Sequence, residues 1–237
     1  MRAPPSLLIA GALAALLAPF PALAQAYQCR PLARLAMPPA PRQDEPARRM
    51  PVARYTLVAS WSPEHCKGRG RSDALQCGGQ AGRFGFVLHG LWPEGASGRW
   101  PQWCAVTPRP TPAQLSANLC MTPSPRLLEH AWAKHGSCMT TRPEAYFKVA
   151  GILWQSIRWP DADRLSRQEN LTVGDLRSAY IARNPEWPRP AVGVVIGRTG
   201  WLRELRLCYG LDYRPKACPR FAEGPPDSAP LKIWRGL

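Results

Sequence analysis

The sequence is poor in acidic residues and in histidine. Its 237 residues include 16 Asp and Glu against 31 Lys and Arg, which gives a formal net charge of +15, and only four histidines. Such a charge favours an anionic partner, namely nucleic acid, anionic lipid or acidic glycan. A basic protein from an arginine-favouring genome is the plainer alternative. No five basic residues follow one another, so we expect a broad positive field and no basic tail.

No CxxC pair occurs among the cysteines, which argues against a zinc knuckle and against a thioredoxin-like site. Eight cysteines are present nevertheless, all after residue 24. An even number in an exported chain predicts four disulfides. The cysteines are Cys29, Cys66, Cys77, Cys104, Cys120, Cys138, Cys208 and Cys218.

Long apolar runs are also lacking, except near the start of the chain. The run from Leu7 to Leu17 follows Arg2 and precedes the small-x-small site Ala22–Ala24. It is too short to span a bilayer comfortably, and its flanks are typical of a signal peptide. We therefore expect residues 1–24 to be a signal peptide and the protein to be exported, to the periplasm or the medium, without membrane association.

The exported part is expected to contain an N-terminal arm and one domain. Residues 25–54 are rich in Pro, Ala and Arg and lack periodicity, so we expect an extended arm. Residues 55–237 form the expected domain. Tyr55–Trp61 and Arg83–Trp92 read as strands, the second with His89 at its end.

Helices are expected in the middle of the chain and strands again near its end. Capping-box patterns start at Thr111, Thr141 and Thr172, and Ser124-Pro125 can begin a further helix. The stretches "AVGVVIG" and "WLRELRLCY" follow and read as strands. Because no regular βαβ rhythm or internal repeat occurs, the sequence predicts a single α+β domain.

Half of the histidines lie in "LEHAWAKHGSC", Leu128–Cys138. His130 and Lys134 share one helix face, and His135 follows directly. A zinc protease needs histidines at i,i+4 with a glutamate between them, whereas this spacing is i,i+5 without one, so we expect no metal. Two imidazoles and an ammonium suit an oxyanion such as phosphate. With His89, they provide the acid–base pair that phosphodiester cleavage requires.

Two segments resemble the active-site segments of the ribonuclease T2 family. They are "HGLWP" at His89–Pro93 and "EHAWAKHGSC" at Glu129–Cys138. "LVASWSPEHC" at Leu57–Cys66 also resembles the first core strand of the family. The likeness extends from about Tyr55 to Cys218, leaves the arm uncovered, and is closest to the bacterial periplasmic members known as ribonuclease I.

This resemblance implies a central antiparallel sheet flanked by helices and cleavage of single-stranded RNA without metal or cofactor. His135 would be the general base that deprotonates the ribose 2′-hydroxyl, and His89 the general acid that protonates the departing 5′-oxygen. Lys134 would stabilise the phosphorane, and His130 would hold the phosphate. A 2′,3′-cyclic phosphate would form first and then be hydrolysed to a 3′-phosphate. DNA, which lacks the 2′-hydroxyl, should resist cleavage.

The resemblance also implies a base contact at Trp92 and Glu94, although Trp92 is equally compatible with a core position. We expect a monomer. The chain departs from the family at Ala131, where the family has a glutamate after the first histidine of the helical segment. Glu129, one residue before His130, points about 100° away from it on a helix and is not an obvious substitute. We expect reduced activity from this change. Rival interpretations are an RNA-binding or toxic protein with weakened catalysis on the same fold, and a metalloenzyme.

The resemblance further implies the disulfides Cys104–Cys138 and Cys208–Cys218. For the other four cysteines we expect Cys66–Cys77 and Cys29–Cys120. The alternative is Cys29–Cys66 with Cys77–Cys120.

Overall fold

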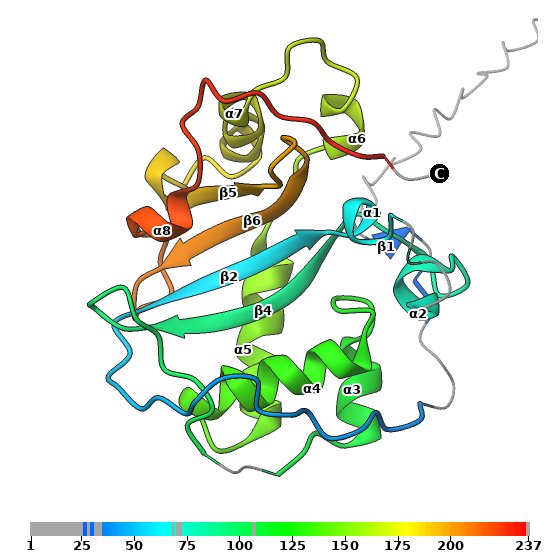
Figure 1. The fold of residues 1–237 in the computed structure, drawn as a ribbon, viewed down its shortest axis with the longest axis vertical. Coiled ribbons are helices and arrows are strands. Elements are labelled where there is room, and N and C mark those ends of the chain that lie inside the picture. Colours follow the sequence, from blue (N-terminus) through cyan, green and yellow to red (C-terminus); the bar gives the residue numbers. More distant parts are fainter. Residues whose placement is uncertain are drawn as a thin grey trace, which may run out of the picture.

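The core of the fold is an antiparallel sheet whose strand order is β4-β2-β6-β5 (Figure 1). Its strands are β2 (Arg54–Trp61), β4 (Phe86–Glu94), β5 (Val192–Ile196) and β6 (Leu202–Tyr209). The short strands β1 (Ala26–Tyr27) and β3 (Arg83–Phe84) pair separately. The computed structural model describes residues 26–27, 29–30, 35–67, 69, 73–105 and 108–235, and the expected signal peptide lies outside them.

The two faces of the sheet differ in polarity. Leu57 and Ala59 of β2 and Leu205 and Leu207 of β6 are fully buried in the main hydrophobic core. Because side chains alternate along a strand, the intervening residues face the other side. On β6 these residues include Glu204 and Arg206, so one face packs in the core and the other carries charge.

Helices surround the sheet on several sides (Figure 1). In this view α5 passes behind the sheet, α3 and α4 lie below β4, and α6 and α7 lie near β5. The helices are α1 (Ser62–His65), α2 (Ala74–Cys77), α3 (Pro112–Asn118), α4 (Pro125–Lys134), α5 (Pro143–Ser156), α6 (Ala162–Leu165), α7 (Val173–Arg183) and α8 (Arg220–Glu223). The 3₁₀ turns are η1 (Gly136–Cys138) and η2 (Arg189–Ala191). This architecture confirms the α+β class, the antiparallel sheet and the single domain.

Two of the three predicted capping boxes are present, and the start predicted at Ser124 is also found. Full capping boxes begin at Thr111 for α3 and at Thr172 for α7. The capping box expected at Thr141 is wrong, because α5 begins at Pro143 and this places Arg142 at the N-cap without a side-chain cap. Ser124 caps α4 by accepting a hydrogen bond from the Leu127 backbone.

Four disulfides join all eight cysteines, in the preferred pairing. The alternative that pairs Cys29 with Cys66 is wrong. Cys29–Cys120 ties the beginning of the arm to the domain, and the blue segment in Figure 1 then runs past α3 and α4 toward β2. The arm is therefore fixed to the domain near both of its ends.

Candidate active site

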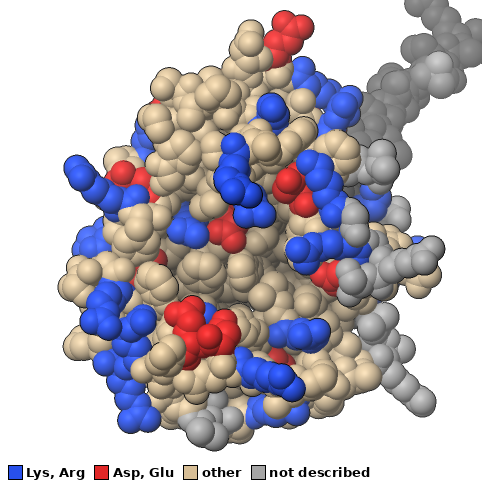
Figure 2. All heavy atoms as spheres, in the orientation of Figure 1, with Lys and Arg blue, Asp and Glu red and all other residues tan. Residues whose placement is uncertain are grey.

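A cavity of about 630 Å³ opens between the polar face of the sheet, the end of α4 and the N-terminal arm. The space-filling view shows lysines and arginines spread over this face of the molecule, with acidic groups among them (Figure 2). The cavity contains all six residues that the sequence singled out: His89, Trp92, Glu94, His130, Lys134 and His135. Segments that are distant in the sequence therefore meet at one site.

His89 lies within β4, not at its end as expected. In the pairing with β2, Gly90 lies opposite Val58 and Leu88 lies opposite Ala59, so His89 is the extra residue of a bulge. A bulge leaves one residue unpaired and turns its side chain away from the regular alternation. The bulge thus directs the imidazole of His89 into the cavity.

Two neighbours hold the His89 ring from behind. Its Nδ1 lies 3.1 Å from Glu204 Oε1 and 3.3 Å from Ser60 Oγ. Burial alone would raise the pKa of the Glu204 carboxyl. The hydrogen bond to His89 and the charges of His89 and Arg206 have a larger combined effect, so the pKa of Glu204 is lowered. An ionised Glu204 accepts a hydrogen bond from Nδ1–H, which leaves Nε2 of His89 for the cavity.

His135 follows the last residue of α4 and is 7% exposed. Its backbone N–H donates to Ala131 O at 3.0 Å, and its ring stacks on the indole of Trp92 with 5.0 Å between centroids. Burial, reinforced by the charge of Lys134, holds the pKa of His135 well below its usual value of 6.5. The imidazole is therefore neutral at mildly acidic pH and can accept a proton there.

The indole of Trp92 lies between the two candidate catalytic histidines. One contact is the stack on His135, and the other is an edge contact with His89, with 5.2 Å between centroids. Arg206 lies 5.8 Å from the same ring. Trp92 is therefore half-buried at the wall of the cavity, which is neither a core position nor a free platform.

Glu94 is a buried acid at the wall of the same cavity. Burial raises its pKa, although Thr56 donates a hydrogen bond to Oε1 at 2.7 Å. Among the described residues, its other oxygen, Oε2, has no hydrogen-bond partner. This oxygen can take up a polar group of a ligand.

Lys134 and His130 project from one face of α4 toward two acids of the arm. Lys134 Nζ lies 3.0 and 3.1 Å from the two oxygens of Asp44 and 2.9 Å from Glu45 Oε1. His130 Nε2 lies 3.8 Å from Asp44. The arm thus contributes two carboxylates to the cation cluster of the cavity.

The pKa shifts of this cluster reflect its charge pairs. Burial opposes the charge of Lys134, but hydrogen bonds to Glu45 and Asp44 raise its pKa. The hydrogen bond from Lys134 lowers the pKa of Glu45. Burial alone would raise the pKa of Asp44, but the hydrogen bonds from Lys134 and Trp103 together lower it. Burial lowers the pKa of His130 despite the nearby Asp44. Lys134 and both carboxylates are therefore charged at neutral pH.

Ala131 lines the cavity, and Glu129 does not replace the missing carboxylate. Both oxygens of Glu129 accept hydrogen bonds from Arg109, at 2.8 to 3.1 Å, and its side chain is 1% exposed. Glu129 precedes Ala131 by two residues, which is about 200° around the helix, so its side chain points away from the cavity. Asp44 and Glu45 are the acids that reach the cluster instead.

Among the described residues that line the cavity, no three potential ligand atoms lie close enough together to hold a metal ion. Among the described ranges, the grouping with ligand-like proximity is His65, Asp73 and Cys77, away from the cavity. Cys77 is disulfide-bonded to Cys66, so its sulfur is not available as a thiolate. His65 Nε2 lies 2.8 Å from Asp73 Oδ2, so a hydrogen bond joins these two groups.

The middle of the chain is similar to a known protein family. Residues 53–162, slightly less than half of the chain, match the model of the Ribonuclease T2 family. A probable ribonuclease of Haemophilus influenzae is 35% identical over 132 residues, which are 50% of this chain and 48% of that protein. A ribonuclease of Aeromonas hydrophila is 38% identical over 112 residues, 47% and 48% of the two chains. The chain thus spans about half the length of the curated relatives it matches.

Solved structures share the ribonuclease T2 fold. The crystal structure of RNase NT in complex with 5′-AMP aligns with a TM-score of 0.60 at 21% identity, over 78% of this chain and 98% of that one. Trichomaglin, described as a novel S-like ribonuclease, aligns with a TM-score of 0.60 at 19% identity, over 77% and 98%. At this identity the likeness establishes the fold.

Three charged residues that line this cavity, and a fourth that lies behind His89, were missed from the sequence. Glu204 and Arg206 occupy the polar face of β6, and the alternation of that strand was the signal that could have found them. Asp44 and Glu45 lie in the arm, which the resemblance does not cover. They are the two acids of the arm, but nothing in its composition indicates that this segment lies against α4.

Proposed function

We propose that the protein is a metal-independent endoribonuclease that cleaves single-stranded RNA. The observation that carries the proposal is the pair of imidazoles, His89 and His135, on either side of Trp92 in one cavity that also holds Lys134 and His130. Two proton-transferring groups and a phosphate-binding cluster are what cleavage by the ribose 2′-hydroxyl requires. The chemistry needs no cofactor.

In this mechanism His135 acts as the base. Its lowered pKa keeps it neutral, so that Nε2 can take the proton of the 2′-hydroxyl as that oxygen attacks phosphorus. His89, held by Glu204 through Nδ1, donates a proton from Nε2 to the departing 5′-oxygen. Lys134 and His130 bind the phosphate oxygens on which negative charge develops. The resulting 2′,3′-cyclic phosphate is hydrolysed by water with the two histidines in exchanged roles, which yields a 3′-phosphate.

Substrate selection follows from the same groups. DNA has no 2′-hydroxyl to serve as nucleophile, so it is not a substrate. Trp92 and Glu94 contact a base, and the unpartnered Oε2 of Glu94 supports a polar contact. The net charge of +15 favours a polyanion through counterion release.

Export and a monomeric state belong to the same proposal. Four disulfides suit an oxidising compartment such as the periplasm or the medium. None of the helices in the described part of the chain has the length and apolarity needed to cross a membrane.

Incubation of the purified protein with RNA in EDTA tests the proposal. We expect cleavage to 2′,3′-cyclic and 3′-phosphate ends, and no cleavage of the matched DNA. A His135→Ala preparation, purified in parallel, controls for contaminating ribonucleases. Retention of RNA without cleavage would favour the rival RNA-binding or toxic protein weakened at Ala131, and loss of activity in EDTA would favour a metalloenzyme.

A further inference from the structure

The ammonium of Lys134 is already saturated by the chain itself. Three carboxylate oxygens, two from Asp44 and one from Glu45, lie 2.9 to 3.1 Å from Nζ. A lysine has three N–H donors, the same number as these acceptors. A phosphate that binds Lys134 must therefore displace at least one carboxylate.

Asp44 also faces the imidazole of His130. His130 Nε2 lies 3.8 Å from Asp44 Oδ2, so the groups proposed to bind phosphate both point toward an arm carboxylate. The side chains of Asp44 and Glu45 are 48% and 44% exposed. A ligand entering from solvent can consequently reach the same donors and compete for them.

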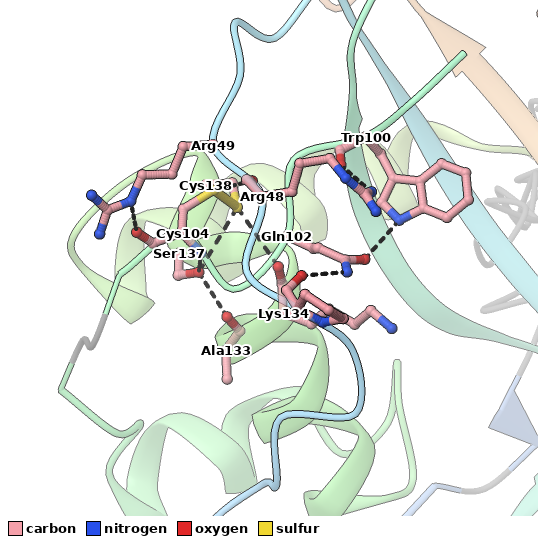
Figure 3. Close-up of a disulfide and its surroundings, with 10 residues drawn as sticks. Arg48, Arg49, Trp100, Gln102, Cys104, Ala133, Lys134, Ser137 and Cys138 are labelled. Carbon is pink, nitrogen blue, oxygen red and sulfur yellow. Dashed lines mark hydrogen bonds between the residues drawn. A yellow bond between two sulfur atoms is a disulfide. The ribbon is translucent and has the colours of Figure 1, made fainter.

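The arm holds its carboxylates in place through contacts that do not involve Lys134. Trp103 donates from Nε1 to Asp44 at 3.0 Å, and Gln102 donates from Nε2 to Glu45 at 3.0 Å. The backbones of Arg48 and Gln102 bond to each other in both directions. Figure 3 shows this part of the arm beside the end of α4, with Arg48 and Gln102 near Lys134. The carboxylates are thus pre-positioned, as fixed parts of the cavity.

We propose that Asp44 and Glu45 compete with the substrate phosphate for Lys134 and His130, and so set the affinity of the cavity for RNA. This inference rests on the proposed function, because it assumes that the phosphate binds Lys134 and His130. The carboxylates bring two negative charges to the place where the scissile phosphate binds. They weaken binding of every polyanion at the cavity and make it depend on displacement of an internal acid.

Binding of a single-stranded oligodeoxynucleotide to the full chain tests the inference, since this ligand lacks the 2′-hydroxyl and is not consumed. The variant is Asp44→Asn/Glu45→Gln, in which amide oxygens still accept from Trp103 and Gln102. We expect Kd to fall about tenfold or more. We also expect the salt dependence of log Kd to steepen by about 0.7, the value for one further phosphate neutralised.

Asp163→Asn/Glu169→Gln is the matched control, because it removes the same two charges from exposed positions outside the cavity. Its Kd should change by less than about twofold. The single variants Asp44→Asn and Glu45→Gln, with thermal melting of each protein, separate a lost competitor from a damaged fold. An equal effect in the control, or an unchanged Kd in folded variants of the arm, would overturn the inference.

Parallel RNA cleavage separates this inference from the proposed function. We expect the arm variant to lower KM with kcat little changed. A lower kcat with unchanged oligonucleotide binding would mean that the carboxylates assist the reaction, which contradicts competition. If neither the wild type nor the variant cleaves RNA, the proposed function fails, while the oligodeoxynucleotide Kd still decides the role of the arm.

Discussion

Replacing Glu204 with glutamine isolates the electrostatic support of the proposed general acid. Glu204 Oε1 lies 3.1 Å from His89 Nδ1, and the amide oxygen of glutamine can accept the same hydrogen bond. The substitution therefore retains the orientation of the ring and removes a negative charge that stabilises the protonated imidazole. His89 is 34% exposed and Glu204 is 16% exposed at the side chain, so solvent screens part of this effect.

Coulomb's law gives the size of the loss. Two charges about 4 Å apart at an effective dielectric constant of about 40 interact by about 2 kcal/mol. Arg206, whose Nη2 lies 3.3 Å from the second oxygen of Glu204, already offsets part of the carboxylate's charge. We therefore expect kcat/KM to fall about tenfold, which corresponds to about 1.4 kcal/mol of barrier.

The assay is cleavage of a dinucleotide between pH 4 and pH 8 by wild type, Glu204→Gln and the exposed control Glu169→Gln. We expect the lower rate of Glu204→Gln throughout this pH range, because the carboxylate supports His89 wherever it acts as the acid. The control should retain the wild-type rate. An unchanged rate in Glu204→Gln would refute the assignment of His89 as an acid supported by Glu204.

Three further predictions concern α4 and β4. His89→Ala and His135→Ala should each lower kcat by about 10²–10⁴-fold with the melting temperature little changed, and near-wild-type turnover in either would contradict the two-histidine mechanism. Ala131→Glu should raise kcat about tenfold, because a carboxylate one turn before His135 can hydrogen-bond its ring or the phosphate. Oligonucleotide binding should stay unchanged or weaken, since the variant adds a negative charge. Unchanged turnover in a dinucleotide assay would indicate that the arm acids already fill this role. The pKa of His135 in the folded chain lies below the value of about 6.5 in the unfolded chain, so the unfolded chain binds more protons below pH 6.5. The free energy of unfolding should therefore decrease as pH falls below 6.5, by up to about 1.4 kcal/mol per pH unit. Urea unfolding at pH 7 and pH 5.5 should show a smaller decrease for His135→Gln, and equal decreases would be inconsistent with a buried neutral imidazole.

Local patterns predicted the elements that carry the site, because they depend on residues close in sequence. Ser124-Pro125 marked the start of α4, and the spacing within this helix placed His130 and Lys134 on one face. The stretch "WLRELRLCY" likewise marked the strand that became β6. The helix start predicted at Thr141 was wrong, because a capping motif expresses only a local preference. The helix begins at Pro143, one residue later than the motif requires.

The parts of the site that depend on distant pairing could not be predicted. The bulge at His89 exists only in the register of β4 against β2, which no residue of β4 reveals by itself. Glu204 lies 115 residues from His89, and Asp44 lies 90 residues from Lys134. The arm has no hydrophobic periodicity, so its course across α4 follows from Cys29–Cys120 and from polar contacts to the domain.

The disulfide that fixes the arm also bears on how the chain matures. Cys29 is synthesised first, but its partner Cys120 follows 91 residues later, after Cys66, Cys77 and Cys104 have already appeared. Oxidation in the order of synthesis would join Cys29 to Cys66, and reaching the native pair then requires thiol–disulfide exchange. A chain oxidised in that order therefore needs thiol–disulfide exchange, spontaneous or catalysed by an isomerase, before its arm is correctly assembled. A host that oxidises thiols without reshuffling them should yield chains whose acidic segment is misplaced.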